Sequence, residues 1–97
     1  MNYETLTKQT PVTLIEFYAT WCPHCRRMMP VMDDVKEMLD GQVAVTQLDI
    51  DKNDDVAQAC KVESVPTFII YKNGVEQWRN TGEMESQELV GKVKSFQ

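Results

Sequence analysis

Residues 12–25 read Val-Thr-Leu-Ile-Glu-Phe-Tyr-Ala-Thr-Trp-Cys-Pro-His-Cys, an apolar run that leads directly into two cysteines three positions apart. Residues 12–19 are β-branched and aromatic and are apolar on both faces, a pattern typical of a central strand covered by helices on both sides. Glu16 interrupts that run, and a carboxylate in such a strand needs a chemical reason. The stretch predicts a buried strand that ends where a helix begins, with both cysteines at the junction.

The two cysteines, Cys22 and Cys25, have the spacing of a pair that can form and break a disulfide. Positions i and i+3 on a helical turn place their Cβ atoms roughly 5–6 Å apart, and a disulfide needs about 3.5–4.5 Å, so a modest adjustment closes the bridge. Cys22 falls at the helix N-terminus, where unpaired N–H groups and the helix dipole favour the thiolate. Pro23 occupies the first helical position, where its missing N–H costs nothing. We expect an exposed, nucleophilic Cys22, with Cys25 as its resolving partner.

Length and composition limit the classes of protein that fit. The 97 residues suffice for one small domain, residues 1–97, and the 42% hydrophobic and 26% charged residues are ordinary for a globular chain. The net charge of −5 argues against a nucleic-acid partner, which needs a basic face. No run approaches the roughly 18–20 apolar residues of a membrane span. The N-terminus lacks a signal-peptide pattern, so we expect a cytoplasmic protein, or a periplasmic one if a signal has been removed.

Metal binding is the main alternative for the cysteine pair. A structural zinc site needs four ligands, and His24 and Cys60 lie at unsuitable spacings to complete one with the pair. Covalent haem attachment needs a histidine directly after the second cysteine, where this chain has Arg26. Three cysteines also do not make a structural disulfide framework. The pattern favours redox chemistry, with no metal and no cofactor.

The rest of the chain alternates predicted helices and strands. Helices are expected over residues 3–8, 23–39, 54–60 and 86–96, and strands over residues 12–19, 43–49, 67–71 and 75–80. Pro30 should kink the second helix, Gly41 should follow its end, and Asn53 should cap the third. Asn-Gly at 73–74 is a strong hairpin signal. The order αβαβαββα, with a right-handed crossover between the first two strands, predicts an α/β fold whose site lies at the carboxyl ends of the strands.

These features, in this order, resemble the thioredoxin family from about residue 12 to residue 96. The features are the strand leading into Trp21-Cys22-Pro23-His24-Cys25, Pro30, Leu48-Asp49-Ile50-Asp51, Val65-Pro66-Thr67, Asn73-Gly74 and Gly82. A lone CxxC motif is a weak signal, whereas this ordered set is a strong one. The resemblance implies a thioredoxin fold from which the family's first strand is absent. It leaves a four-stranded mixed sheet flanked by helices, with the strand at 43–49 at an edge.

The resemblance also implies roles for individual residues. Cys22 would attack a substrate disulfide, and Cys25 would be the buried resolving thiol. Pro66 would be a cis-proline that faces the disulfide and leaves the backbone of Val65 free to pair with an extended substrate. The substrate-binding set implied in this way is Trp21, Pro23, Val65, Pro66 and Gly82.

Two departures from the family pattern carry their own predictions. Thioredoxins typically place Gly-Pro between the cysteines, whereas Pro23-His24 is the dipeptide of the bacterial disulfide-oxidase branch. His24, cationic or donating a hydrogen bond, would stabilise the Cys22 thiolate and make the disulfide a stronger oxidant. The family's buried acid is usually aspartate and is here Glu16, which could accept the Cys25 proton. The family often keeps a lysine near that acid, and the matching residue here is Gln47.

Simpler interpretations stand beside these. His24 could be a surface residue, and Glu16 a salt-bridged structural acid. Cys60 fits a small buried hydrophobe better than a regulatory thiol. Trp21 could serve packing alone. Met29, off the main apolar helix face, could line a substrate groove.

The predicted function is protein thiol–disulfide exchange by an enzyme that is more oxidising than an ordinary thioredoxin. The expected partners are disulfide-bearing proteins and a component that recharges the pair, such as a flavin-linked thioredoxin reductase or a membrane oxidant. We expect a monomer that binds neither nucleic acid nor membrane. One alternative is a dedicated disulfide oxidase or isomerase, although the inserted helical domain usual in that branch has no room here. The other is a non-catalytic thioredoxin-like subunit that only binds a partner.

Overall fold

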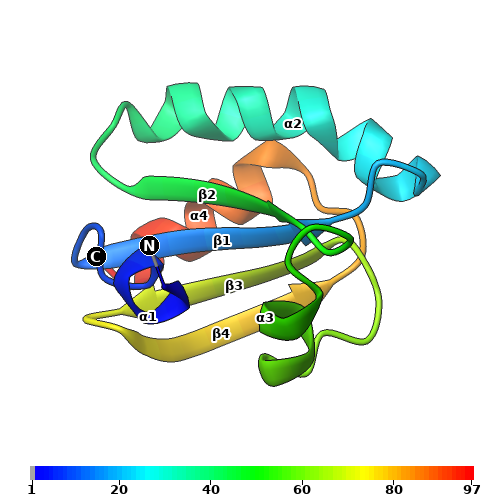
Figure 1. The fold of residues 1–97 in the computed structure, drawn as a ribbon. Coiled ribbons are helices and arrows are strands. Elements are labelled where there is room, and N and C mark those ends of the chain that lie inside the picture. The colour runs from blue at the N-terminus through cyan, green and yellow to red at the C-terminus, as the bar shows by residue number, and fades with distance from the viewer. Residues whose placement is uncertain (1) are drawn as a thin grey trace.

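Strand β1 (Val12–Tyr18) lies inside a four-stranded sheet of order β2-β1-β3-β4. It pairs in parallel with β2 (Ala44–Asp49) and antiparallel with β3 (Thr67–Lys72), which pairs antiparallel with β4 (Val75–Thr81). The computed structural model describes residues 2–97 and shows this sheet between helices (Figure 1). The predicted four-stranded mixed sheet, with β2 at one edge, is confirmed.

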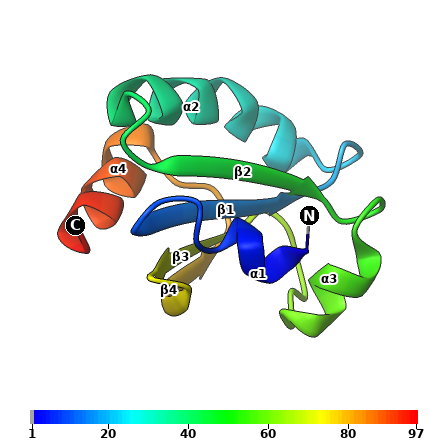
Figure 2. The same cartoon turned by 60° about the vertical axis from the view of Figure 1, so that its left-hand side comes forward.

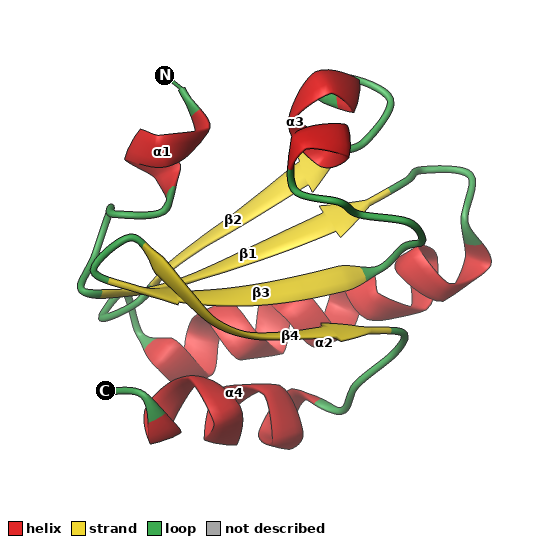
Figure 3. Ribbon diagram, turned by 90° about the horizontal axis from the view of Figure 1, so that it is seen from below, coloured by secondary structure: helices red, strands yellow, loops and turns green. Residues whose placement is uncertain are grey.

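Helices cover both faces of the sheet. α2 (Pro23–Leu39) and α4 (Ser86–Ser95) lie on one face, and α1 (Tyr3–Leu6) and α3 (Asp54–Ala59) lie on the other (Figures 1, 2 and 3). Side chains alternate along β1, so that Leu14 packs in the core beneath α2 and α4, while Ile15 and Phe17 pack in the core beneath α1 and α3. All three are fully buried, which explains why β1 is apolar on both faces.

The element order αβαβαββα is confirmed, and the differences from prediction lie at the ends of helices and strands. Asp40 takes the left-handed conformation at the end of α2 (φ 49°), and Gly41 follows it with a positive φ (73°), as expected for a glycine after the helix end. Asn53 stands at the N-cap of α3 but does not cap it with its side chain. Its amide instead donates to the Asp49 carbonyl at 2.9 Å, which ties the start of α3 to the end of β2. α2 runs unbroken through Pro30.

The hairpin between β3 and β4 has the expected turn. Asn73 and Gly74 both have positive φ (53° and 82°), as a two-residue turn between antiparallel strands requires. Among residues 2–97, no helix has the length and apolar character needed to cross a bilayer.

Candidate active site

The two cysteines lie where the carboxyl end of β1 meets the start of α2. Cys22 is the N-cap residue of α2, with extended backbone angles (φ −89°, ψ 120°), and Pro23 is the first helical residue. The Cys22 N–H donates to the Ala19 carbonyl at 3.3 Å, which closes the turn out of β1. Cys25 follows one helical turn later. Strand and helix therefore fix both thiols, as the sequence predicts.

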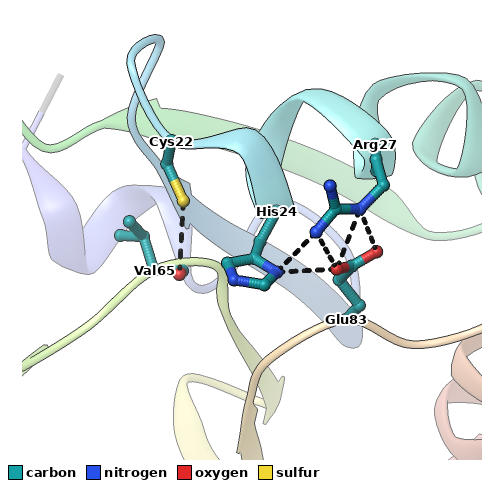
Figure 4. Close-up of polar contacts among 5 residues, drawn as sticks. All are labelled: Cys22, His24, Arg27, Val65 and Glu83. Carbon is teal, nitrogen blue, oxygen red and sulfur yellow. Dashed lines mark hydrogen bonds and ion pairs between the residues drawn. The ribbon is translucent and has the colours of Figure 1, made fainter.

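Cys22 is less accessible than predicted. Its exposed fraction is 6%, against 2% for Cys25, so the expectation that Cys22 is exposed is wrong. Val65 packs over the pair, and the Cys22 thiol donates to its carbonyl oxygen at 3.7 Å (Figure 4). Cys22 is buried because Val65, in the loop before β3, lies against it. The sequence of residues 12–25 does not indicate where that loop lies. A small accessible area remains, as attack on an extended segment would need.

The start of α2 nevertheless favours the Cys22 thiolate. The pKa of Cys22 is lowered, first by a hydrogen bond from the Cys25 backbone N–H, then by the Cys25 thiol, the His24 N–H and the positive charge of Arg27. Desolvation by burial opposes these effects and is outweighed. The two backbone N–H groups are those of the helix N-terminus that the sequence predicts.

The pKa of Cys25 is shifted in the opposite direction from that of Cys22. Burial raises the pKa of Cys25 to about 11, and the neighbouring Cys22 and the Glu16 carboxylate add to that rise. A thiol in such surroundings stays protonated at neutral pH and needs a base before it can attack. The site thus pairs a thiol that ionises readily with one that does not.

The buried acid Glu16 lies on the α2 face of β1 and is 1% exposed. Burial raises the pKa of Glu16 to about 7, against the lowering effects of a hydrogen bond from Gln47 and the charge of Lys36. Gln47 stands beside Glu16 in the parallel β1–β2 register, and its Nε2 donates to Glu16 Oε1 at 2.9 Å. Lys36 Nζ in turn donates to Gln47 Oε1 at 2.6 Å. A lysine therefore reaches the acid indirectly, from α2 and through Gln47.

His24 takes part in an ion cluster with Arg27 and Glu83 (Figure 4). His24 Nδ1 lies 2.7 Å from Glu83 Oε2, and Arg27 Nη2 lies 2.8 Å from that oxygen and 2.8 Å from Nδ1. Arg27 and then His24 hold the pKa of Glu83 low, at about 2. The hydrogen bond expected from the His24 side chain to Cys22 is not what the structure shows, because the imidazole turns its Nδ1 to Glu83. His24 instead reaches Cys22 through its backbone N–H.

Sequence reasoning missed three residues of this site, namely Arg27, Lys36 and Glu83. Arg27 and Lys36 belong to the polar face of α2, where a charged residue is ordinary. Glu83 directly follows Gly82, which the resemblance places in the substrate-binding set. Its position next to Gly82 could therefore have indicated that Glu83 lies near the cysteines.

The residues assigned to substrate binding gather around the cysteines. The Val65–Pro66 peptide bond is cis, as the resemblance implies, and the Gly82 N–H donates to the Pro66 carbonyl at 2.8 Å. Gly82 has φ 109°, a conformation that side-chain-bearing residues rarely adopt. Trp21 is 59% exposed and its indole N–H donates to Asp51 Oδ2 at 2.8 Å, so most of its side chain lies outside the core, beside the cysteines.

A hollow of about 250 Å³ adjoins Cys25 on the side of β1 and the first turns of α2. Its lining residues are Tyr18, Ala19, Thr20, Cys25, Arg26 and Met29. Met29 is 57% exposed, so it lies at the surface beside this hollow and not in the core.

Cys60 lies away from the other two cysteines. It is half-buried and packs against the core cluster that contains Tyr71, with Tyr3 nearby. This placement agrees with a small hydrophobe. Within residues 2–97, no group of three or more His, Cys, Asp or Glu side chains is arranged to hold a metal ion.

Comparison with known proteins gives one family. The family model described as Thioredoxin matches residues 1–95. Thioredoxin Y of rice chloroplasts (Oryza sativa subsp. japonica) is 36% identical over 92 residues, which are 95% of this chain and 55% of the rice protein. A thioredoxin-like protein of Synechocystis is 31% identical, with coverage of 96% of this chain and 89% of that protein. This chain spans about half the length of the chloroplastic relatives it matches.

Solved structures agree in fold. Mitochondrial thioredoxin 3 of Saccharomyces cerevisiae, in its oxidised form, superposes with a TM-score of 0.86 at 30% identity. The superposition covers 96% of this chain and 86% of the yeast chain. A thioredoxin variant of Halobacterium salinarum superposes with a TM-score of 0.87 at 29% identity, covering 96% and 80%. The α/β architecture with a cysteine pair at the start of its second helix is that of the thioredoxin fold. The chain belongs to the thioredoxin family.

Proposed function

We propose that this chain is a protein thiol–disulfide oxidoreductase that works by dithiol–disulfide exchange. The observation that carries the proposal is the asymmetry of the pair. The pKa of Cys22 is lowered at the start of α2, whereas burial raises the pKa of Cys25 to about 11. The Cys22 thiol can therefore ionise and attack at neutral pH, whereas the Cys25 thiol, one helical turn away, stays protonated. We propose that the 97 residues act as one thioredoxin-like unit and as a monomer.

In the first step, the Cys22 thiolate attacks one sulfur of a substrate disulfide. A Cys22–substrate disulfide forms, the substrate disulfide breaks, and its second sulfur leaves as a thiolate that takes a proton from water. The backbone N–H groups of His24 and Cys25 hold the attacking thiolate before this step. Because these donors belong to a rigid helix start, they do not need to reorganise during attack.

In the second step, Cys25 gives its proton to the Glu16 carboxylate and attacks Cys22 Sγ. The Cys22–Cys25 disulfide forms, the Cys22–substrate bond breaks, and the substrate leaves as a thiolate. Two electrons have then passed from the protein dithiol to the substrate. A base with a pKa of about 7 is suited to this transfer, because it is partly ionised at neutral pH.

Substrate binding is proposed along the Val65–Pro66 segment. Among residues 2–97, Val65 is not part of a strand, and the partner of its carbonyl is the Cys22 thiol. Once Cys22 ionises, that weak hydrogen bond is lost and the carbonyl can accept an N–H from an extended peptide. Main-chain pairing tolerates many sequences. Trp21, Pro23 and Gly82 would flank such a peptide, as the resemblance implies.

The pair is proposed to be more oxidising than that of an ordinary thioredoxin. The support comes from the groups that favour the reduced form, since stabilising the Cys22 thiolate makes the disulfide a stronger oxidant. His24 contributes its backbone N–H, and Arg27 contributes its positive charge, and both lower the pKa of Cys22. A component that returns the pair to its starting state is required, and a flavin-linked reductase or a membrane oxidant would serve.

Reduction of insulin by dithiothreitol with catalytic amounts of the protein tests the proposal. The wild-type protein should accelerate insulin precipitation, and Cys22→Ser should abolish the acceleration. Cys60→Ser is the matched control, because Cys60 lies away from the pair, and it should retain activity. Wild-type turnover no greater than that of Cys22→Ser would contradict the proposal and would favour a non-catalytic, partner-binding subunit.

A further inference from the structure

Three side chains from three elements form a continuous hydrogen-bonded row that ends at the buried acid. Lys36 on α2 donates to Gln47 Oε1 (2.6 Å), and Gln47 on β2 donates through Nε2 to Glu16 Oε1 on β1 (2.9 Å). Glu16 is 1% exposed, Gln47 is half-buried, and Lys36 is at the surface. The row therefore runs from solvent to the interior.

The side-chain amide of Gln47 has two possible orientations, and the neighbouring groups of Lys36 and Glu16 determine which one it adopts. A glutamine amide presents an oxygen that accepts and a nitrogen that donates. The Lys36 ammonium group can only donate, so it takes the amide oxygen. The amide NH₂ then necessarily turns to Glu16, where it favours a carboxylate over a carboxylic acid.

We propose that Lys36 is a positioning residue for proton transfer, which fixes the Gln47 amide so that its NH₂ group holds Glu16 as a carboxylate. This inference rests on the proposed role of Glu16 as acceptor of the Cys25 proton. Without Lys36, the amide is free to turn its oxygen to Glu16. That orientation accepts a hydrogen bond from the protonated acid and so favours the form that cannot receive a proton.

Few other groups near Glu16 affect its charge state, so the hydrogen bonds from Lys36 through Gln47 have a large influence on it. The titratable and charged groups that act on Glu16 come from α2, namely Lys36 and the Cys25 thiol. The facing residue of β3 is Phe68, which carries no charge. Burial raises the pKa of Glu16, and the Gln47 hydrogen bond and the Lys36 charge are the two influences that lower it. Both depend on the same lysine.

The direct test is the titration of Glu16 in the reduced protein, followed by carboxyl ¹³C NMR. Lys36→Met should move the titration midpoint upward and reduce the ionised fraction of Glu16 at pH 7 by a factor of about three to ten. Lys94→Met makes the same charge change on α4 and should leave the midpoint in place. A midpoint in Lys36→Met equal to that in Lys94→Met would overturn the proposal.

Two further variants separate amide orientation from simple charge. Lys36→Arg keeps both the charge and the donors and should restore the wild-type midpoint. In a Gln47→Leu background the amide is gone, so Lys36→Met should change the midpoint much less than it does with Gln47 present. An equal change in both backgrounds would show that Lys36 acts as a charge alone and would overturn the proposal.

Kinetics distinguish this inference from the proposed function. The rate at which Cys25 resolves a mixed disulfide on Cys22 should fall at pH 7 in Lys36→Met by the same factor as the ionised fraction, and should recover at higher pH. If the midpoint moves but the rate does not, Lys36 still fixes the Gln47 amide and the charge state of Glu16, but the roles of Glu16 and Lys36 in proton transfer are both overturned.

Discussion

Cys22 and Cys25 lie one helical turn apart, yet their neighbours differ in the respects that control a thiol. Cys22 faces backbone N–H groups at the start of α2 and lies near the surface ion cluster of His24, Arg27 and Glu83. Cys25 faces the interior and a carboxyl group, Glu16, in β1. Figure 4 shows the first of these surroundings, with the Cys22 sulfur directed to the Val65 carbonyl and the ion cluster beside it.

The comparison shows how one short segment supports two kinds of chemistry. On the Cys22 side, charge is stabilised by donors that the helix supplies in any case, and the ion cluster is exposed and screened by solvent. On the Cys25 side, burial suppresses charge until a base accepts the proton. Changes on the buried side should therefore have larger effects than changes on the exposed side.

The largest expected effect is that of Glu16→Gln on stability. Burial raises the pKa of Glu16 from 4.5 to about 7, so the folded protein retains a proton that the unfolded chain loses between those values. Stability therefore falls as pH rises through that interval, and the loss is complete above pH 7. Glu16→Gln should remove the loss and raise the free energy of unfolding at pH 8 by about 3 kcal/mol, with little change near pH 4.

Urea unfolding at pH 4 and pH 8 measures this effect. Glu37→Gln, on the exposed face of α2, provides a control that changes the same charge and should have no comparable effect. If Glu16→Gln were no more stable than the wild type at pH 8, burial of the Glu16 carboxylate would not destabilise the protein. The proposed difference between the buried surroundings of Cys25 and the exposed surroundings of Cys22 would then be contradicted.

An intermediate effect is expected from His24. His24→Gly removes the imidazole but keeps the backbone N–H, and His24→Pro removes both. Each should make the pair more reducing, by about 30 mV, a tenfold change in the equilibrium constant, for the proline variant and less for the glycine variant. Equilibration with glutathione buffers measures the potentials. An unchanged potential in His24→Pro would rule out His24 as a source of oxidising character.

The smallest effect is expected from Glu83→Gln. Removing the carboxylate leaves the positive charge of Arg27 uncompensated near Cys22, so the pKa of Cys22 should fall further. Because the ion cluster is exposed, the change in thiolate fraction at pH 6 should be only about twofold and should diminish in 1 M salt. Titration of thiolate absorbance measures it. A change in the opposite direction would mean that Glu83 helps the thiolate, most simply by holding Arg27 in place.

The features readable from the sequence are those with a local cause. β1 is apolar on both faces because each face meets a helix layer, and the Asn73-Gly74 turn is set by its own backbone. The tuning of Cys22 follows from its place before Pro23 at the start of α2. Such properties need no knowledge of distant residues.

The features that escaped prediction depend on contacts between distant segments. Glu83 meets His24 across 59 positions, and the burial of Cys22 depends on Val65, 43 positions away. The link from Gln47 to Lys36 joins a strand to a helix through side chains alone. Only the fold brings these groups together, so periodicity and motif spacing could not reveal them.

The central claim is that Cys22 is a thiolate at pH values where an ordinary thiol is protonated. The pH dependence of alkylation by iodoacetamide, resolved by residue in reduced Cys60→Ser protein, tests it most directly. The account predicts that Cys22 reacts with a midpoint below the roughly 8.5 of a free cysteine, while Cys25 stays unreactive to much higher pH. A midpoint for Cys22 at or above that of an unstructured peptide thiol would contradict the account.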